Sequence, residues 1–146
     1  IVMACNFLRY NKMKKIKKIK IKTYLAKTGK LTPIDFSRKF PIQVKRIFFL
    51  YGKKNKIRGD HAHKKCSQFF FLICGRVILD IKTPNENKKI LLTHSSKIAV
   101  LVPPKYWCSV KFINKNSILM VACDQHYNFN DYLGTFEDYK NYLRKK

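Results

Sequence analysis

Two histidines two residues apart, His61 and His63, are the side chains in this sequence best suited to proton transfer. In a β-strand, residues i and i+2 project from the same face about 7 Å apart, so the two imidazoles would face a common space. An imidazole ordinarily titrates near pH ~6.5 and exchanges protons around neutral pH. By itself the pair is equally compatible with an exposed strand. The other two histidines, His94 and His126, lack comparable neighbours and are interpreted as surface or structural residues.

Five further side chains could act on a substrate beside this pair. Arg58 could stabilise a developing oxyanion or bind a diphosphate through charge-assisted hydrogen bonds, and Arg46 could reach the same diphosphate. Tyr51 could bring a phenol to the pocket, and Trp107 could stack on a base or a sugar. Gln68 is expected to hydrogen-bond a substrate hydroxyl or a histidine ring, because a buried amide needs partners. A surface position, a salt bridge or simple packing remains the alternative for the arginines and the aromatic residues.

The elements that would position these residues are short strands. Segment 68–74 (QFFFLIC) is apolar throughout, which is typical of a strand buried on both faces, and a dimer partner would cover one of them. Segment 130–143 has aromatic residues at helical spacing, which predicts one amphipathic C-terminal helix. Strands are predicted over residues 44–51, 58–63, 68–74, 76–81, 89–93, 98–102 and 117–122. Several short strands separated by turn residues predict an all-β sandwich or barrel.

The composition is that of a folded single domain. The chain has 146 residues, of which 46% are hydrophobic, so it can bury a core despite a formal net charge of +24. We expect residues 1–23 to form a basic N-terminal arm or edge strand and residues 24–146 to form the domain. The lysines are scattered along the chain, which indicates a solvated surface that would also steer a diphosphate towards the protein.

Composition also bears on location and partners. The five cysteines form no CxxC pair and are interpreted as reduced thiols of a cytoplasmic protein. We expect no membrane association, because no apolar run approaches the ~20 residues of a membrane span. A basic barrel that binds nucleic acid is a rival interpretation. The chain lacks the strand of alternating aromatic and basic residues typical of single-strand binding, so we expect no nucleic-acid partner.

The spacing around the histidines follows the two sequence motifs of the cupin β-barrels. Gly59-x-His61-x-His63 and Gln68 match the first motif, in which a glutamate normally stands where Gln68 does. Cys108 occupies the histidine position of the second motif. Metal-binding cupins use the two histidines, the glutamate and the later histidine as ligands, so the amide of Gln68 would weaken such a site. Zinc held by His61, His63 and Cys108 is the alternative.

Over about residues 26–142 the chain resembles a known family, the nucleotide-sugar 3,4-ketoisomerases, which are WxcM-like proteins of the cupin superfamily. The resemblance implies a cupin fold, a double-stranded β-helix or jelly-roll barrel, with a short C-terminal helix. It also implies a homodimer that needs neither metal nor cofactor. The residues that carry it are Gly29-Lys30-Leu31, Asp35, Phe40-Pro41, Lys45-Arg46-Ile47-Phe48-Phe49, Arg58-Gly59-Asp60-His61-Ala62-His63-Lys64-Lys65, Gln68, Pro103-Pro104, Trp107, Phe112, Asp131-Tyr132 and Tyr139.

The reaction implied by the resemblance moves the ketone of dTDP-4-keto-6-deoxyglucose from carbon 4 to carbon 3 through an enediolate, in the biosynthesis of unusual deoxy and amino sugars for surface glycans. His61 would be the base at carbon 3, with His63 either exchanging the proton at carbon 4 or orienting the substrate. Family members often differ at Thr28, at Phe48 or Phe49, and at Cys108, which bears on the configuration of the product. A metal-dependent cupin, a nucleotide-sugar epimerase and a cupin that binds without catalysis are the alternatives.

Overall fold

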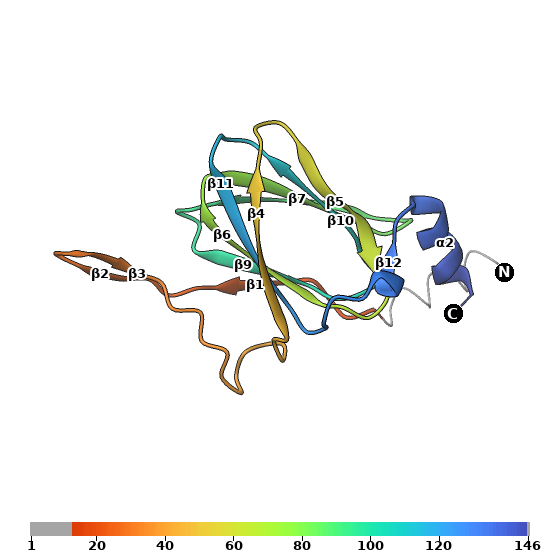
Figure 1. Ribbon diagram of the computed structural model, residues 1–146, viewed down its shortest axis with the longest axis horizontal. Helices are drawn as coiled ribbons and strands as arrows, with labels where there is room; N and C mark the ends of the chain where they lie inside the picture. Colours follow the sequence, from red (N-terminus) through yellow and green to blue (C-terminus); the bar gives the residue numbers. More distant parts are fainter. Residues whose placement is uncertain (1–12, 146) are drawn as a thin grey trace.

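The computed structural model describes residues 13–145, and its strands form two five-stranded sheets (Figure 1). Every strand pairing described is antiparallel. The first sheet has the order β1 (Lys17–Lys20), β9 (Ile98–Val102), β6 (Gln68–Cys74), β11 (Ser117–Cys123) and β4 (Arg46–Gly52). The second sheet has the order β12 (Tyr132–Leu133), β5 (Ile57–His63), β10 (Trp107–Phe112), β7 (Arg76–Lys82) and β8 (Asn87–Thr93).

The main core lies between the two sheets. Phe70 and Leu72 of the first sheet meet Val77, Leu79 and Phe112 of the second, and none of these side chains is more than 4% exposed. Burying one such side chain contributes about 1.5–3 kcal/mol, so this shared layer holds the sheets together. The arrangement confirms the predicted all-β jelly-roll barrel of the cupin type.

Most strands lie where the sequence predicted them. β6 and β9 have the predicted bounds. β5, β7, β8 and β11 differ from the prediction by one or two residues at one end, and β4 differs at both ends. β10 was not predicted as a strand. Within the segment expected to be an arm or edge strand, β1 pairs with β9 at the edge of the first sheet, whereas residues 1–12 lie outside the described part of the chain.

The outer face of β6 is covered in part by the chain itself. Phe69 is fully buried, and its ring lies 4.8 Å from that of Phe40 in the segment that precedes β4. Ile42 and Val44 of the same segment pack against this cluster. Further along β6, Ile73 remains 46% exposed. The prediction that a dimer partner must cover this strand is therefore wrong for Phe69, which has an intramolecular cover.

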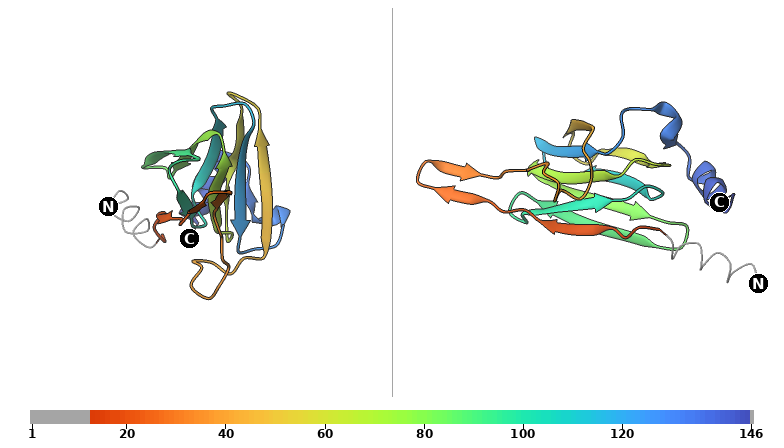
Figure 2. Two further views of the ribbon diagram at one scale, coloured as in Figure 1. Left: turned by 90° about the vertical axis from the view of Figure 1, so that its left-hand side faces the viewer. Right: turned by 90° about the horizontal axis from the view of Figure 1, so that it is seen from below.

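A hairpin of two short strands, β2 (Tyr24–Ala26) and β3 (Gly29–Leu31), projects away from the barrel (Figures 1 and 2). All six of its residues are exposed. Leu25 and Leu31 are 70% and 64% exposed, so the hairpin presents apolar side chains to solvent. A two-stranded hairpin has little stability of its own, which makes an uncovered apolar hairpin unusual.

The C-terminal segment is more complex than the single predicted helix. It consists of a 3-10 turn, η1 (Phe129–Asp131), then β12, and then the helix α2 (Phe136–Arg144). The side chain of Thr135 caps α2 by accepting the backbone N–H of Asp138, and Tyr139 is on the buried face of this helix. The prediction of a helix over residues 130–143 is therefore wrong for its first part. In residues 13–145, no helix has the length and apolar character needed to cross a membrane.

Gly75, between β6 and β7, is a position where the fold tolerates no side chain. Its φ is +88°, and a Cβ atom there would lie 2.2 Å from the Oγ atom of Ser117. We expect Gly75→Ala to lower the free energy of unfolding by about 2 kcal/mol or more, because a strained backbone conformation alone costs about 1–3 kcal/mol. Urea denaturation measures this loss. Gly134→Ala is the matched control, since a Cβ at Gly134 would meet no atom within 4 Å, and its stability should equal that of the wild type.

Candidate active site

His61 and His63 lie at the end of β5 with their rings on the same side of the strand. Their Nε2 atoms are 3.2 Å apart and their ring centroids 4.9 Å apart, with an interplanar angle of 81°. His63 is 4% exposed, whereas His61 is half-buried. The two imidazoles therefore lie on one side of β5 and contact each other directly.

A buried carboxylate holds the inner histidine. The Oδ2 atom of Asp131 lies 2.9 Å from Nδ1 of His63 and accepts the backbone N–H of Cys66 at 3.3 Å. The other oxygen, Oδ1, accepts the backbone N–H of Lys65 at 2.7 Å. Neutral His63 donates Nδ1–H to this carboxylate, so its Nε2 atom is an acceptor directed at His61. Asp131 thereby fixes both the orientation and the tautomer of His63.

Burial keeps both histidines neutral near pH 7. It lowers the pKa of His61 from the ordinary value of 6.5, and the hydrogen bond to the backbone of Gly59 acts against that change. Burial also lowers the pKa of His63, and the hydrogen bond to Asp131 opposes this effect. A neutral imidazole is the form that accepts a proton. When His61 takes one up, the resulting imidazolium can donate to Nε2 of His63 across the 3.2 Å contact.

A β-bulge in β5 brings Arg58 and His61 to the same cavity. Residues three apart in a regular strand point to opposite faces. Here Cys108 pairs with His61 but the next residue of β10 pairs with Gly59, so Asp60 is an extra residue. Gly59 and Asp60 have φ values of +81° and +60°, which is the backbone distortion that re-aims side chains at a bulge.

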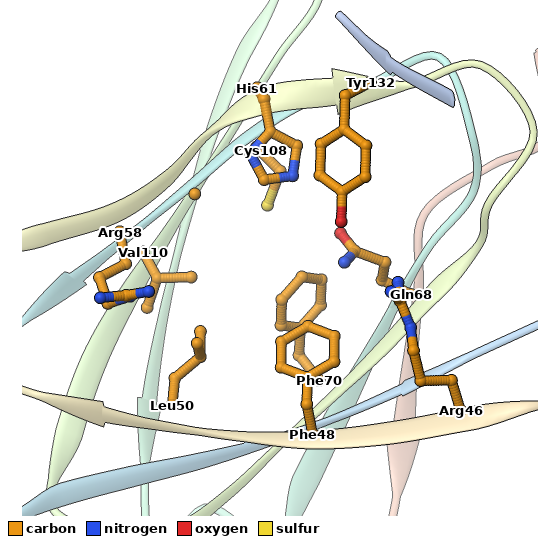
Figure 3. Close-up of a pocket in the computed structure, with 11 residues that line it drawn as sticks. Arg46, Phe48, Leu50, Arg58, His61, Gln68, Phe70, Cys108, Val110 and Tyr132 are labelled. Atoms are coloured by element: carbon orange, nitrogen blue, oxygen red, sulfur yellow. The ribbon is translucent and has the colours of Figure 1, made fainter. Parts of the chain in front are cut away.

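These residues border a cavity of about 330 Å³ inside the barrel, on the side of the sheets where the histidines lie (Figure 3). His61 lines it, whereas His63 lies behind His61 and is absent from the lining. Apolar side chains from both sheets form much of the wall, and the polar groups are few, as in most small-molecule sites. The lining consists of Arg46, Phe48, Leu50, Arg58, Gly59, His61, Gln68, Phe70, Cys108, Val110 and Tyr132.

Arg46 and Gln68 both line this cavity. Arg46 donates from its terminal nitrogen to the sulfur of Cys123 at 3.7 Å, and its guanidinium hydrogen-bonds the phenol of Tyr132. The Nε atom of Arg46 is buried and has no hydrogen-bond partner among the described residues. A buried donor without an acceptor is costly, so this nitrogen is suited to a polar ligand atom.

Tyr51 does not line the cavity, so the prediction that it brings a phenol to the pocket is wrong. Side chains alternate along β4, so Arg46, Phe48 and Leu50 point into the barrel while Tyr51 points outward and is 72% exposed.

Trp107 is also absent from the cavity lining. Its side chain is buried beneath α2, where its ring lies 5.4 Å from that of Phe136. Its indole N–H donates to Oδ1 of Asp60 at 2.9 Å. Trp107 therefore holds the β5 bulge from the outside of the barrel and does not stack on a ligand in the cavity.

Tyr132 is the cavity residue that the helical pattern concealed. It pairs with His63 through β12, and its ring centroid lies 4.4 Å from that of His63 and 4.8 Å from that of His61. Asp131, immediately before it, was missed for the same reason. The helical spacing of the aromatic residues placed both residues in a helix. The family resemblance, which includes Asp131-Tyr132, was the one feature of the sequence that pointed to them.

The donor set does not fit the metal site of other cupins. Burial raises the pKa of Cys108 to about 12, which disfavours the thiolate that would bind zinc. Gln68 replaces the carboxylate ligand with a weaker amide. In the described part of the chain, the group of donors close enough to hold a metal is His63, Cys66 and Asp131, and it includes neither His61 nor Cys108. Two members of that group are already hydrogen-bonded to each other.

A jelly-roll barrel with paired histidines at its cavity defines a cupin-type enzyme. Comparison with known families narrows this class, because the family model described as "FdtA: WxcM-like, C-terminal" matches residues 12–144. The chain belongs to this family, which confirms the resemblance noted in the sequence.

Named relatives agree with this assignment. The chain is 30% identical over 132 residues to TDP-4-oxo-6-deoxy-alpha-D-glucose-3,4-oxoisomerase of Aneurinibacillus thermoaerophilus, covering 88% of this chain and 93% of the relative. Among solved structures it is similar to QdtA, a sugar 3,4-ketoisomerase from Thermoanaerobacterium thermosaccharolyticum in complex with TDP. This match has 28% identity and a TM-score of 0.82, and covers 89% and 95% of the two chains. A histidine-to-asparagine mutant of QdtA in complex with TDP-4-keto-6-deoxyglucose matches at 27% identity and a TM-score of 0.83, covering 92% and 97%.

The lowered pKa values predict how stability depends on pH. A histidine whose pKa is lower in the folded chain binds fewer protons there than in the unfolded chain, so the free energy of unfolding falls as the pH falls through 6.5. Each histidine contributes at most about 1.4 kcal/mol per pH unit. Urea denaturation at several pH values between 7 and 5.5 measures the free energy of unfolding, which should fall less steeply with pH in His61→Asn than in the wild type. The variant His94→Asn, at an exposed site, should show the same pH dependence as the wild type. A free energy of unfolding that rises on acidification would contradict the prediction.

Proposed function

We propose that this chain is a sugar 3,4-ketoisomerase that converts dTDP-4-keto-6-deoxyglucose into the corresponding 3-keto sugar by proton transfer at His61. The observation that carries this proposal is the arrangement of His61 in the cavity wall, 3.2 Å from His63, which is itself 2.9 Å from the buried Asp131. The names of the relatives support the same reaction and the same substrate.

The proposed chemistry begins at carbon 3 of the sugar, whose hydrogen is acidified by the neighbouring carbonyl. Neutral His61 removes this proton, and the electrons of the C–H bond form an enediolate. His63 accepts a hydrogen bond from the imidazolium, and Asp131 stabilises His63 in turn. The hydroxyl proton of oxygen 3 passes to oxygen 4, and the proton held by His61 returns to carbon 4 as the carbonyl forms at carbon 3. Since His63 lies behind His61, we assign the base to His61 and a supporting role to His63.

Cationic residues suit the diphosphate of this substrate. Arg46 and Arg58 both line the cavity, and neither loses its charge at working pH. The unpaired Nε of Arg46 offers a donor, and Gln68 can hydrogen-bond a sugar hydroxyl. A net charge of +24 would also draw an anionic nucleotide towards the protein. The structure of QdtA in complex with TDP supports a nucleotide ligand.

Replacing His61 tests this proposal directly. The protein is incubated with dTDP-4-keto-6-deoxyglucose in heavy water, and NMR follows deuterium at carbons 3 and 4 together with the product. We expect His61→Asn to lose about 10²–10⁴-fold in turnover, the usual contribution of general acid–base catalysis. His94→Asn, at an exposed site, should retain wild-type activity. Binding of the sugar without isomerisation by the wild-type chain would contradict the proposal.

We further propose that the enzyme is a homodimer whose interface includes the outward face of β4. This strand is at an edge of the first sheet, and its outward side chains Ile47, Phe49 and Tyr51 are 41%, 49% and 72% exposed. Phe49 pairs with Met120 of β11, which pairs with Phe71 of β6, so the apolar surface continues across three strands. An extended apolar face of this kind is typical of a protein–protein interface. In a symmetric dimer, the same face of a second copy would cover it.

A charge on this face should dissociate the dimer. We expect Phe49→Asp to reduce the mass measured by sedimentation from about twice 17.3 kDa to 17.3 kDa. A carboxylate buried against an apolar partner surface is strongly unfavourable. Leu91→Asp is the matched control, because Leu91 is 50% exposed on the second sheet, and this variant should remain dimeric. A wild-type chain that sediments at 17.3 kDa would rule out the dimer.

A further inference from the structure

Two cysteines, Cys66 and Cys123, lie in contact inside the barrel. Their side chains share a hydrogen bond, and both are free thiols. They are 2% and 0% exposed and belong to the main core between the two sheets. A disulfide requires the two sulfur atoms to approach to about 2 Å. Two thiols that already share a hydrogen bond therefore need only a small movement to form one.

Cys123 lies beside the wall of the cavity. In the first sheet it pairs with Arg46 of β4 on one side and with Gln68 of β6 on the other. Paired residues of adjacent strands project from the same face of a sheet. Arg46 and Gln68 line the cavity of about 330 Å³ drawn in Figure 3, and both hydrogen-bond the sulfur of Cys123. A water-sized oxidant that enters this cavity therefore meets residues in direct contact with that sulfur.

Arg46 and Cys66 make the sulfur of Cys123 the more reactive of the pair. The hydrogen bond from the thiol of Cys66 lowers the pKa of Cys123 below its ordinary value of 9.0, and the hydrogen bond from Arg46 acts in the same direction, whereas burial opposes both. The thiolate is the form that attacks an oxidant. The hydrogen bond with Cys123 raises the pKa of Cys66, which stays a thiol. Cys123 is thus the nucleophile and Cys66 is placed as its resolving cysteine.

The other described cysteines lack this arrangement. Burial raises the pKa of Cys108 to about 12, so its sulfur stays protonated. Cys74 is half-buried, and its thiol donates to the backbone oxygen of Asn116 at 3.0 Å. Within residues 13–145, neither of them hydrogen-bonds a second cysteine. The contact between Cys66 and Cys123 is therefore the place where oxidation of this chain should begin.

We propose that Cys66 and Cys123 are an oxidation site, at which hydrogen peroxide converts two thiols into a reversible intramolecular disulfide. The thiolate of Cys123 attacks one oxygen of the peroxide, the O–O bond breaks, and hydroxide leaves. The product is a sulfenic acid on Cys123. The sulfur of Cys66 then attacks that of Cys123, the S–O bond breaks, and the hydroxyl group leaves as water with the thiol proton of Cys66. The two sulfur atoms lose two electrons, which the peroxide gains, and a dithiol reductant reverses the reaction.

The disulfide would change the groups that hold the histidines and the ligand. Cys66 lies between β5 and β6, and its backbone N–H donates to Oδ2 of Asp131 at 3.3 Å. Bonding to Cys123 draws Cys66 towards β11 and so disturbs the carboxylate that orients His63. It also removes the thiolate that accepts from Arg46. This consequence rests on the proposed function, under which the oxidised chain should turn over its substrate more slowly.

Peroxide treatment of the full chain tests this inference. The oxidised protein is digested with its remaining thiols blocked, and mass spectrometry looks for a peptide in which Cys66 and Cys123 are cross-linked. We expect this peptide in the treated wild type and its loss after dithiothreitol. Isomerase turnover should fall by about 10-fold or more and recover on reduction, because a displacement of about 1 Å in a site can cost as much as about 10²-fold.

Serine variants assign the two sulfur atoms. Cys123→Ser should form no cross-link. Cys66→Ser should stop at the sulfenic acid of Cys123, which dimedone labels, so this variant keeps the test open if Cys123→Ser does not fold. Cys74→Ser is the matched control, because Cys74 contacts neither cysteine of the pair among the described residues. This variant should form the cross-link as readily as the wild type.

The absence of a cross-link between Cys66 and Cys123 in the treated wild type would overturn the inference. A cross-linked chain with unchanged turnover would overturn the effect on the site. A reduced wild-type chain without isomerase activity would overturn the proposed function, and the mass measurement would still decide whether the disulfide forms. The two failures are therefore distinguishable in one set of samples.

Discussion

The hydrogen bond between Asp131 and His63 is the interaction on which the site depends. Burying a carboxylate is expensive unless its oxygens are satisfied, and here two backbone N–H groups and one imidazole satisfy them. These contacts join the turn η1 to the end of β5, and β12 continues the connection by pairing with the same strand. One electrostatic contact thus orients the inner histidine and also fixes the C-terminal segment that supplies Tyr132 to the cavity.

The second constraint is the irregularity of β5. A regular strand would divide Arg58 and His61 between the two faces of the sheet, and only the extra residue Asp60 brings both to the cavity. The bulge is held from outside, because Trp107 donates to Asp60 and is itself packed beneath α2. The C-terminal helix therefore supports the cavity without touching it. The bulge of β5 thus connects the residues that line the cavity with the residues that pack beneath α2.

The sequence predicted the barrel and the histidine pair well, because a period of two residues follows from strand geometry alone. It could not assign the faces of β4, since IFFLY is apolar at every position and alternation leaves no trace; Tyr51 was therefore misplaced. Trp107 was predicted to stack on a base or a sugar, but its side chain is buried beneath α2, a helix that lies well after it in the chain. Asp131 and Tyr132 were hidden by aromatic spacing that continues smoothly into the true helix. Each error involves a contact between segments distant in the chain, which local patterns do not record.

The order of the segments has a consequence for how the protein is made. The ribosome releases the chain from its N-terminus, and β4 must wait for β11, about 70 residues later, before it can join its sheet. The strands that enclose the main core are all present once β11 has emerged, whereas Asp131 and Tyr132 follow β11 in the chain. A nascent or truncated chain can thus fold its core while its histidines still lack the carboxylate that aligns them.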